Sequence, residues 1–249
     1  MWCGRSVAVV VPAYNEERLI GRTVNQLPPW VDHAIVVDDA STDQTAAQAL
    51  ATGRAGLHLR RHERNRGVGA ATVTGYRRAL ELDAELIVGS NGDAQMNPDD
   101  IPALLGELDA DADLVRGNRF ARPQTIVRMP PSRRLAIRTL SALTRWATGV
   151  AKVSDSQSGY HALTASALRR LDLDALWPRY GFPNDLVARA AEAGLAVAEV
   201  GVDAIYGEQP GGLRPWHAIY PVSAVILAAG GRRLSQRLAA ALATRTDPR

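Results

Sequence analysis

The sequence predicts a single α/β domain of the Rossmann-like type, with a mainly parallel central sheet and helices on both of its faces. Short β-branched runs alternate with amphipathic stretches through the first half of the chain. The runs at 7–11 and 34–37 are apolar throughout, as in strands that are buried on both faces. The 249 residues, 46% of them hydrophobic, could form one large domain or two small ones, and no clear interdomain linker separates two parts.

The first half contains five expected strands, which follow one another at regular intervals. They lie at residues 7–11, 34–37, 57–60, 85–88 and 113–117. Helices are expected between them at residues 16–27, 43–51, 69–82 and 99–108. Ser41 and Gln44 have the spacing of a capping box, and Asn97 followed by Pro98 is a typical helix start.

The second half is less regular. Residues 121–132 are rich in proline and arginine and are expected to form a mobile loop before a helix at 133–149. The segments "GYHAL" and "AVAEVGVDAIY" indicate two more strands, and residues 184–194 indicate another helix. A helical tail is expected at residues 216–249, where it could dock on a membrane, on another subunit or on its own domain.

Composition limits the compartment and the partners. The net charge of +3 with an excess of arginine suggests a negatively charged partner, but no nucleic-acid-binding module is present. Cys3 is the single cysteine, which excludes an internal disulfide and a cysteine-based zinc site. The apolar run Ala218 to Gly231 is shorter than the roughly 20 residues that span a bilayer. We therefore expect a cytoplasmic protein, soluble or peripheral on the cytoplasmic face of the membrane.

Polar clusters follow four of the expected strands. They read "PAYNEE", "DDASTD", "SNGDAQ" and "GNRF". Ligands of open α/β sheets bind at the carboxyl ends of the strands, so these clusters are expected to meet at one edge. Carboxylates and amides together suit Mg²⁺ or Mn²⁺ bridging to substrate phosphates. No dinucleotide-binding or P-loop glycine pattern is present.

Five motifs in this order resemble family 2 glycosyltransferases of the GT-A fold. They are "VVVPAYNEERLI", "IVVDDASTDQT", "NRGVGAATVTGYRRAL", "NGDAQMNP" and "GNRF", and "DSQSGYHAL" resembles a segment of the polyprenyl-phosphate glycosyltransferase branch, which includes dolichyl-phosphate mannosyltransferase. The resemblance covers roughly residues 6 to 208. It implies a nucleotide-binding half at about 1–120 and an acceptor half at about 121–215 of a domain spanning 1–215. Whether the chain forms a homo-oligomer is left open.

The resemblance also implies roles for the matching positions. Asp93 and Gln95 would ligate Mg²⁺ or Mn²⁺, Asp39 would accept a hydrogen bond from the base, and Arg119 would contact the diphosphate. The remaining residues that would line the donor pocket are Pro12, Ala13, Tyr14, Glu16, Val37, Asn91 and Gly92. The expected activity is inverting transfer of a sugar from a nucleotide diphosphate sugar to a polyprenyl phosphate.

One position departs from the family pattern. Asn91 stands where the family usually has a carboxylate, so that the motif is N-G-D-A-Q. An amide oxygen can ligate a hard cation or accept a ribose hydroxyl, but it brings no negative charge. We therefore expect a working metal site that is weaker than in the family.

The acceptor decides whether a general base is needed. A polyprenyl phosphate is already ionised, whereas a soluble hydroxyl acceptor needs a base, for which Asp155 and Asp185 are the candidates. Asp185 could equally cap a helix. A non-catalytic protein that binds a nucleotide sugar is a third reading. Of the histidines, His62 is expected at the surface, and His161 could contact substrate.

Overall fold

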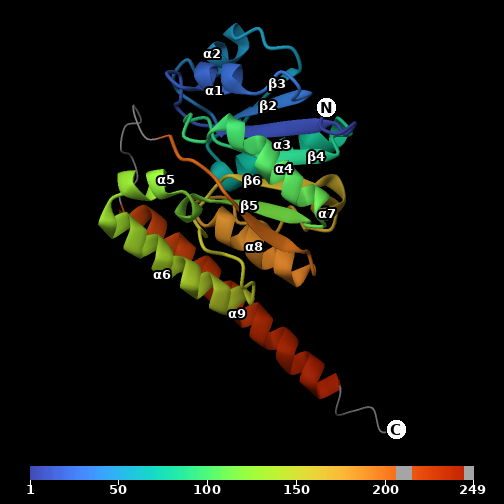
Figure 1. Cartoon of the computed structure of the whole chain (residues 1–249), viewed down its shortest axis with the longest axis vertical. Helices are drawn as coiled ribbons and strands as arrows, with labels where there is room; N and C mark the ends of the chain where they lie inside the picture. The colour runs from blue at the N-terminus through green and yellow to red at the C-terminus, as the bar shows by residue number, and fades with distance from the viewer. Residues whose placement is uncertain (206–214, 244–249) are drawn as a thin grey trace.

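A computed structural model describes residues 1–205 and 215–243 (Figure 1). A seven-stranded sheet with the order β3-β2-β1-β4-β6-β5-β7 forms its centre. The strands are β1 (Val7–Ala13), β2 (His33–Asp38), β3 (Leu57–Arg61), β4 (Leu86–Gly89), β5 (Leu114–Asn118), β6 (His161–Thr164) and β7 (Val197–Gly201). Only β6 among these strands runs antiparallel to its neighbours, β4 and β5. The predicted mainly parallel sheet is therefore confirmed.

Helices cover both faces of the sheet, as the apolar strands require. They are α1 (Ile20–Gln26), α2 (Thr45–Ala51), α3 (Val68–Glu81), α4 (Ile101–Asp109), α5 (Pro123–Arg128), α6 (Pro131–Thr148), α7 (Ala165–Arg169), α8 (Phe182–Glu192) and α9 (Pro215–Ala243), with 3₁₀ turns at Pro98–Asp100 and Arg119–Ala121. Alternate residues of β1 enter different cores. Val9 packs in the core that contains α1 and α4, and Val10 packs in the core that contains α3 and α8.

Two local predictions were wrong. The expected loop at 121–132 contains α5 and the start of α6, because Pro123 and Pro131 occupy first-turn positions, where a missing N–H costs nothing. Ser41 does not cap α2: its hydroxyl accepts a hydrogen bond from the backbone N–H of Asn15 at 3.0 Å. The cap at Asn97 is confirmed, since its side chain accepts from the N–H of Asp99 at 3.2 Å.

The helix α9 packs against α6 and α8 through its first half. Val222, Ile226 and Ala229 form a small core there with Ala147 and Ala188. The second half of α9 extends beyond the rest of the molecule (Figure 1). None of the helices in the described part of the chain has the length and apolar character needed to cross a membrane.

Gly89 at the end of β4 is required by the close approach of His161 on β6. A Cβ at Gly89 would lie 2.2 Å from the imidazole, and both residues are held by strand pairing. We expect Gly89→Ala to lower the free energy of unfolding by about 1–3 kcal/mol, measured by urea denaturation. Gly106→Ala on α4 is the matched control, because its Cβ meets nothing within 4 Å and alanine favours a helix. Equal stability of the two variants would contradict the packing argument.

Candidate functional site

The predicted donor residues meet at the carboxyl ends of neighbouring strands. Pro12 lies opposite Val37 in the pairing of β1 with β2, and Ala13 follows it at the end of β1. The turn after β4 reaches the same edge, where the N–H of Gly92 donates to the carbonyl of Pro12 at 3.1 Å. Three of the four polar clusters are thus brought together by the order β2-β1-β4.

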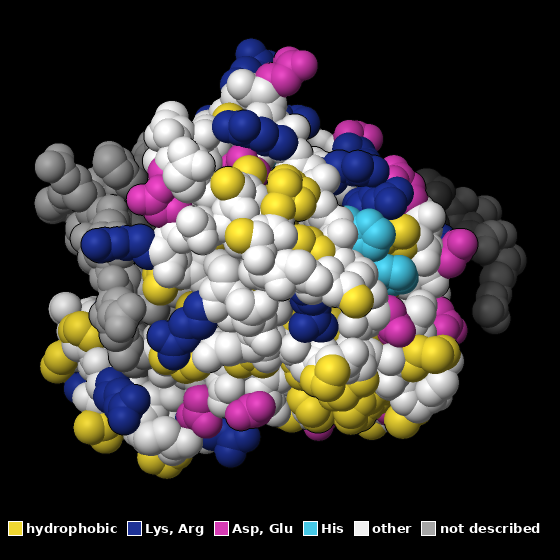
Figure 2. Space-filling view, turned by 90° about the horizontal axis from the view of Figure 1, so that it is seen from above, with side chains coloured by type: hydrophobic (Ala, Val, Ile, Leu, Met, Phe, Trp, Pro, Cys, Tyr) yellow, Lys and Arg dark blue, Asp and Glu magenta, His cyan; other side chains and the backbone are white. Residues whose placement is uncertain are grey.

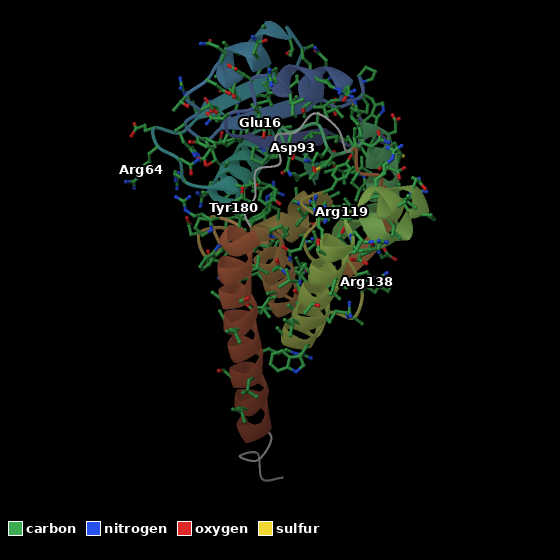
Figure 3. All side chains as sticks on the ribbon, turned by 90° about the vertical axis from the view of Figure 1, so that its left-hand side faces the viewer. Glu16, Arg64, Asp93, Arg119, Arg138 and Tyr180 are labelled. Carbon is green, nitrogen blue, oxygen red and sulfur yellow. The ribbon has the colours of Figure 1, made fainter. Side chains whose placement is uncertain are left out.

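Glu16 and Asp93 form the acidic centre of this edge (Figure 3). Burial raises the pKa of Glu16 to about 7, and the negative charges of Asp93 and Asp43 add to this effect. Burial also raises the pKa of Asp93, although a hydrogen bond from the N–H of Gln95 partly offsets it. A bound cation would stabilise the ionised forms of these two carboxylates, which otherwise disfavour each other's ionisation.

The turn that carries Asp93 is held in a constrained shape. Asp93 accepts from the N–H of Gln95 at 3.0 Å, and the Thr23 hydroxyl donates to the carbonyl of Gly92 at 3.1 Å. Ala94 has a φ of 53°, a left-handed conformation that costs energy for a residue with a side chain. The amide of Asn91 lies against Gly159, where an added Cβ would come within 3.4 Å of it. The backbone thus fixes where the Asp93 carboxylate points.

The donor set fits a hard divalent cation. The carboxylates of Glu16 and Asp93 are oxygen ligands of the kind that Mg²⁺ and Mn²⁺ prefer, and the predicted ligand Gln95 lies on the same turn as Asp93. Within the described residues no group of three or more His, Cys, Asp or Glu side chains forms a complete protein cage. Mg²⁺ usually keeps several waters and substrate phosphates as ligands, so an incomplete set is what such a site needs.

The raised pKa of Glu16 predicts pH-dependent metal binding. The pKa of Glu16 is about 7 in the folded protein, above the ordinary value of 4.5, so folding favours the protonated carboxyl. The stability that this preference contributes is complete below pH 4.5 and is lost as the pH rises through 7. A cation favours the ionised form, so the rise in Tm caused by Mn²⁺ should be larger at about pH 8 than at about pH 6. Thermal unfolding with and without Mn²⁺ measures this. Glu16→Gln should reduce the pH dependence, and an unchanged dependence in that variant would contradict the assignment.

Asp39 anchors the glycine-rich segment that precedes α3. One of its oxygens accepts from the N–H of Gly67 at 2.7 Å, and the other accepts from the N–H of Arg66 at 2.8 Å and lies 2.6 Å from Nδ1 of His62. His62 is buried, so the expectation of a surface histidine was wrong. The contact of its imidazole with the buried Asp39 carboxylate holds it in the interior. The hydrogen bond between Asp39 and the nucleobase of the donor stays a prediction. A bound nucleobase would share the Asp39 oxygens with Arg66, Gly67 and His62.

Arg119 and Asp155 form a bidentate ion pair on the acceptor side of the site. Nε of Arg119 lies 2.6 Å from one oxygen of Asp155, and Nη2 lies 2.9 Å from the other. Burial alone would raise the pKa of Asp155, but Arg119 more than offsets this and lowers it. Figure 3 shows Arg119 between Asp93 and α6, the helix that carries Arg138. Asp155 thereby fixes the direction of the Arg119 guanidinium.

Two residues that sequence reasoning missed hold the segment around Asp155. Glu199 on β7 accepts from the N–H groups of Ser154 and Asp155, at 2.7 and 3.2 Å. Arg116 is fully buried and donates to the carbonyls of Ser158 and Pro183, at 2.6 and 2.8 Å. A charged residue inside the otherwise apolar strand "LVRGN" was the available signal for Arg116.

Asp185 is directed toward the C-terminal helix. It lies in the first turn of α8, and one of its oxygens accepts from Nε of Arg189 and from the N–H of Trp177, both at 2.9 Å. The other oxygen lies 3.3 Å from Nη2 of Arg232 on α9. Gly181 is the N-cap of α8, so the capping role considered for Asp185 was wrong. The pair with Arg232 joins α8 to α9, whereas the pair with Arg189 lies within α8.

Tyr180 is a further site residue that the sequence did not reveal. It is 45% exposed, and burial raises its pKa together with the charges of Asp93 and Glu16, which it faces. Tyr14 on the first loop is also exposed. His161 is instead buried, where its Nδ1 lies 2.7 Å from the carbonyl of Gly159 and its Nε2 contacts the hydroxyl of Tyr76. Burial lowers the pKa of His161 to about 3, so it stays neutral in the core.

Comparisons with known proteins find a family model and several relatives that match this chain. Residues 8–177 match the model of the family described as Glycosyl transferase family 2. The UDP-N-acetylglucosamine–dolichyl-phosphate N-acetylglucosaminyltransferase of Methanococcus voltae is 33% identical, over 81% of this chain and 86% of that protein. The polyprenol monophosphomannose synthase of Mycolicibacterium smegmatis is 34% identical, over 77% of this chain and 74% of that protein.

Solved structures support the fold. The glucosyl-3-phosphoglycerate synthase of Mycobacterium tuberculosis, in complex with Mn²⁺, UDP and phosphoglyceric acid, superposes with a TM-score of 0.70 at 23% identity. The match covers 92% of this chain and 79% of that one. The central sheet and its two layers of helices are thus a GT-A arrangement.

Proposed function

The chain belongs to glycosyl transferase family 2, and on this premise we propose that it transfers a sugar from a nucleotide diphosphate sugar to a polyprenyl phosphate at a membrane surface, with inversion at the anomeric carbon. Relatives named for transfer to dolichyl phosphate and polyprenol phosphate support the acceptor class. A divalent cation held by Asp93 and Gln95 is part of the proposal, since neighbours of this fold were solved with Mn²⁺ or Mg²⁺ and UDP.

The observation that carries the acceptor class is that the carboxylates of both candidate general bases, Asp155 and Asp185, are held in ion pairs. Both oxygens of Asp155 are bound by Arg119, and both oxygens of Asp185 are bound by groups that include Arg189 and Arg232. Arg119 lowers the pKa of Asp155 and so makes it a weaker proton acceptor, and the oxygens of Asp185 are directed to groups of α8 and α9. A phosphate acceptor needs no base, since it is already ionised. The pairs therefore favour a phosphate over a hydroxyl.

Each step of transfer then has a group to support it. An acceptor phosphate oxygen attacks the anomeric carbon, the bond from that carbon to the diphosphate breaks, and the nucleoside diphosphate leaves with the electron pair. Arg119 would offset the charge that develops on the diphosphate, in the direction set by Asp155. The cation would supply further positive charge on the leaving group. Tyr180, which faces Asp93 and Glu16, would contact the sugar.

Purified protein supplied with different nucleotide diphosphate sugars tests the proposal directly. Each donor is incubated with a polyprenyl phosphate, with the matching polyprenol, or with soluble sugars, in the presence or absence of Mn²⁺. We expect product only with the phosphorylated lipid and only with the metal. Transfer to soluble sugars but to no lipid would overturn the acceptor class, and tight donor binding without any turnover would indicate a non-catalytic protein.

Asn91 provides a test of the metal site by gain of charge. Asn91→Asp adds a carboxylate to the turn that carries Asp93, so we expect tighter Mn²⁺ binding and lower stability of the metal-free protein. Calorimetric titration with Mn²⁺ and thermal unfolding without it measure the two effects. If neither changes, position 91 is only a polar contact in the pocket.

A further inference from the structure

The helices α6 and α9 expose large apolar side chains to solvent. Leu135 and Trp146 of α6 are 69% and 68% exposed, and Leu227 of α9 is 70% exposed. We call the whole set the outer stripe. Its residues are Leu135, Leu143, Trp146, Leu227, Leu234 and Leu238.

The two halves of the outer stripe lie side by side. Leu135 and Trp146 are eleven positions apart, as are Leu227 and Leu238, so each pair projects from one side of its helix. The indole of Trp146 lies over Gly230, where an added Cβ would be 3.4 Å from the ring. The other sides of both helices are buried in the core shared with α8. The stripe therefore forms one outward-facing surface.

The segments that carry the outer stripe hold positive charge and no negative charge. The helix α6 contains four arginines and no acidic residue, and two of them, Arg133 and Arg138, are exposed. The helix α9 contains three arginines and no acidic residue, although Arg232 pairs with Asp185 and Glu192 of α8. The whole chain has a net charge of only +3, so the remainder of the chain is net negative. Figure 2 looks onto the opposite end of the molecule, formed by α1 and α2, and shows acidic and basic side chains interspersed there. Positive charge is thus concentrated where apolar side chains are exposed.

We propose that the outer stripe docks on the surface of a membrane that contains anionic lipids. Exposed leucine and tryptophan flanked by arginine are typical of surfaces that enter the headgroup region without crossing the bilayer. A second copy of the chain fits less well, since two such surfaces would bring arginines together without acidic partners.

The site lies close to this surface. Arg138 of α6 lies over the ring of Phe120, at 5.5 Å from its centroid, and Phe120 follows Arg119 directly. A lipid headgroup bound along α6 would therefore be near the acceptor side of the site. The inference goes beyond the proposed function, because docking itself requires neither donor nor turnover.

Flotation with lipid vesicles tests the docking, with no substrate present. The protein is mixed with vesicles of phosphatidylcholine alone or with added phosphatidylglycerol. We expect binding to the anionic vesicles only, and weaker binding as salt increases. Arg134→Gln and Arg138→Gln should each weaken binding by roughly fivefold. Trp146→Ala and Leu234→Ser should also weaken it, whereas the control variants Arg169→Gln and Leu50→Ser, at exposed positions of α7 and α2, should bind like the wild type.

Brominated lipids add a measurement that depends on position. They should quench tryptophan fluorescence in the wild type, and this quenching should largely disappear in Trp146→Phe. Equal binding to neutral and anionic vesicles, or equal loss in the control variants, would overturn the proposal. So would a stable dimer that Leu234→Ser converts to a monomer while vesicle binding is unchanged. Failure of sugar transfer would leave the vesicle results standing, so the two proposals can be judged separately.

Discussion

Asp93→Asn is expected to lower turnover by roughly a hundredfold to a thousandfold, because it removes the negative charge that holds the cation against the diphosphate. The backbone fixes this carboxylate through the N–H of Gln95 and the strained turn at Ala94, so a neighbouring side chain cannot easily replace it. Weaker Mn²⁺ binding should accompany the loss, measured by calorimetric titration.

The metal-free variant should fold at least as stably as the wild type. Burial raises the pKa of Asp93, so ionising it opposes folding, and a neutral amide avoids that cost. This combination distinguishes a ligand from a structural residue, since loss of a structural residue would lower Tm. Asp174→Asn is the matched control, because the Asp174 side chain is 88% exposed and pairs only at the surface with Arg77. Retained Mn²⁺-dependent turnover in Asp93→Asn would refute the assignment.

The sheet and most helices could be predicted from the sequence because their signals are local. The alternation in β1, where Val9 and Val10 enter different cores, requires a strand covered on both sides. The 3₁₀ turn at Pro98 was signalled by its cap, Asn97. The helix α5 was missed because proline and arginine suggested a loop, although Pro123 begins a helix without cost.

The residues that complete the site were hidden because their signals are not local. Tyr180 is 87 positions from Asp93 in the sequence, and only the packing of its loop on α3 brings it to the site. That packing depends on small residues: a Cβ at Gly69 would lie 2.1 Å from the carbonyl of Trp177. The partner of Asp155 was equally hidden, since a lone aspartate in a motif does not show whether its oxygens are bound. The sequence therefore located the donor loops but not how the acceptor side is held together.

Asp155→Asn is expected to lower the free energy of unfolding by about 3–5 kcal/mol, because it removes the carboxylate of a buried bidentate pair with Arg119. Asp155 has a lowered pKa in the folded protein, so its contribution is present above the unfolded-state value near 3.8 and is lost as the pH falls through the folded value. The stability difference between variant and wild type should therefore persist down to about pH 4 and narrow below it. Urea denaturation at a series of pH values measures this.

Turnover in Asp155→Asn separates a positioning residue from a general base. If Asp155 only orients Arg119, kcat should fall by about a hundredfold while the shape of the pH profile is retained. Arg119→Lys, which keeps the charge but cannot make two parallel hydrogen bonds, should give a similar loss, and the double variant should lose little more. Asp185→Asn is the comparison at a second buried aspartate, whose ion pairs face α9. If Asp155 were a general base, Asp155→Asn would remove the acidic limb of the pH profile of kcat. Its effect on kcat would then multiply with the effect of Arg119→Lys. That result would transfer the proposal from a phosphate acceptor to a hydroxyl acceptor, because only the hydroxyl needs the proton removed.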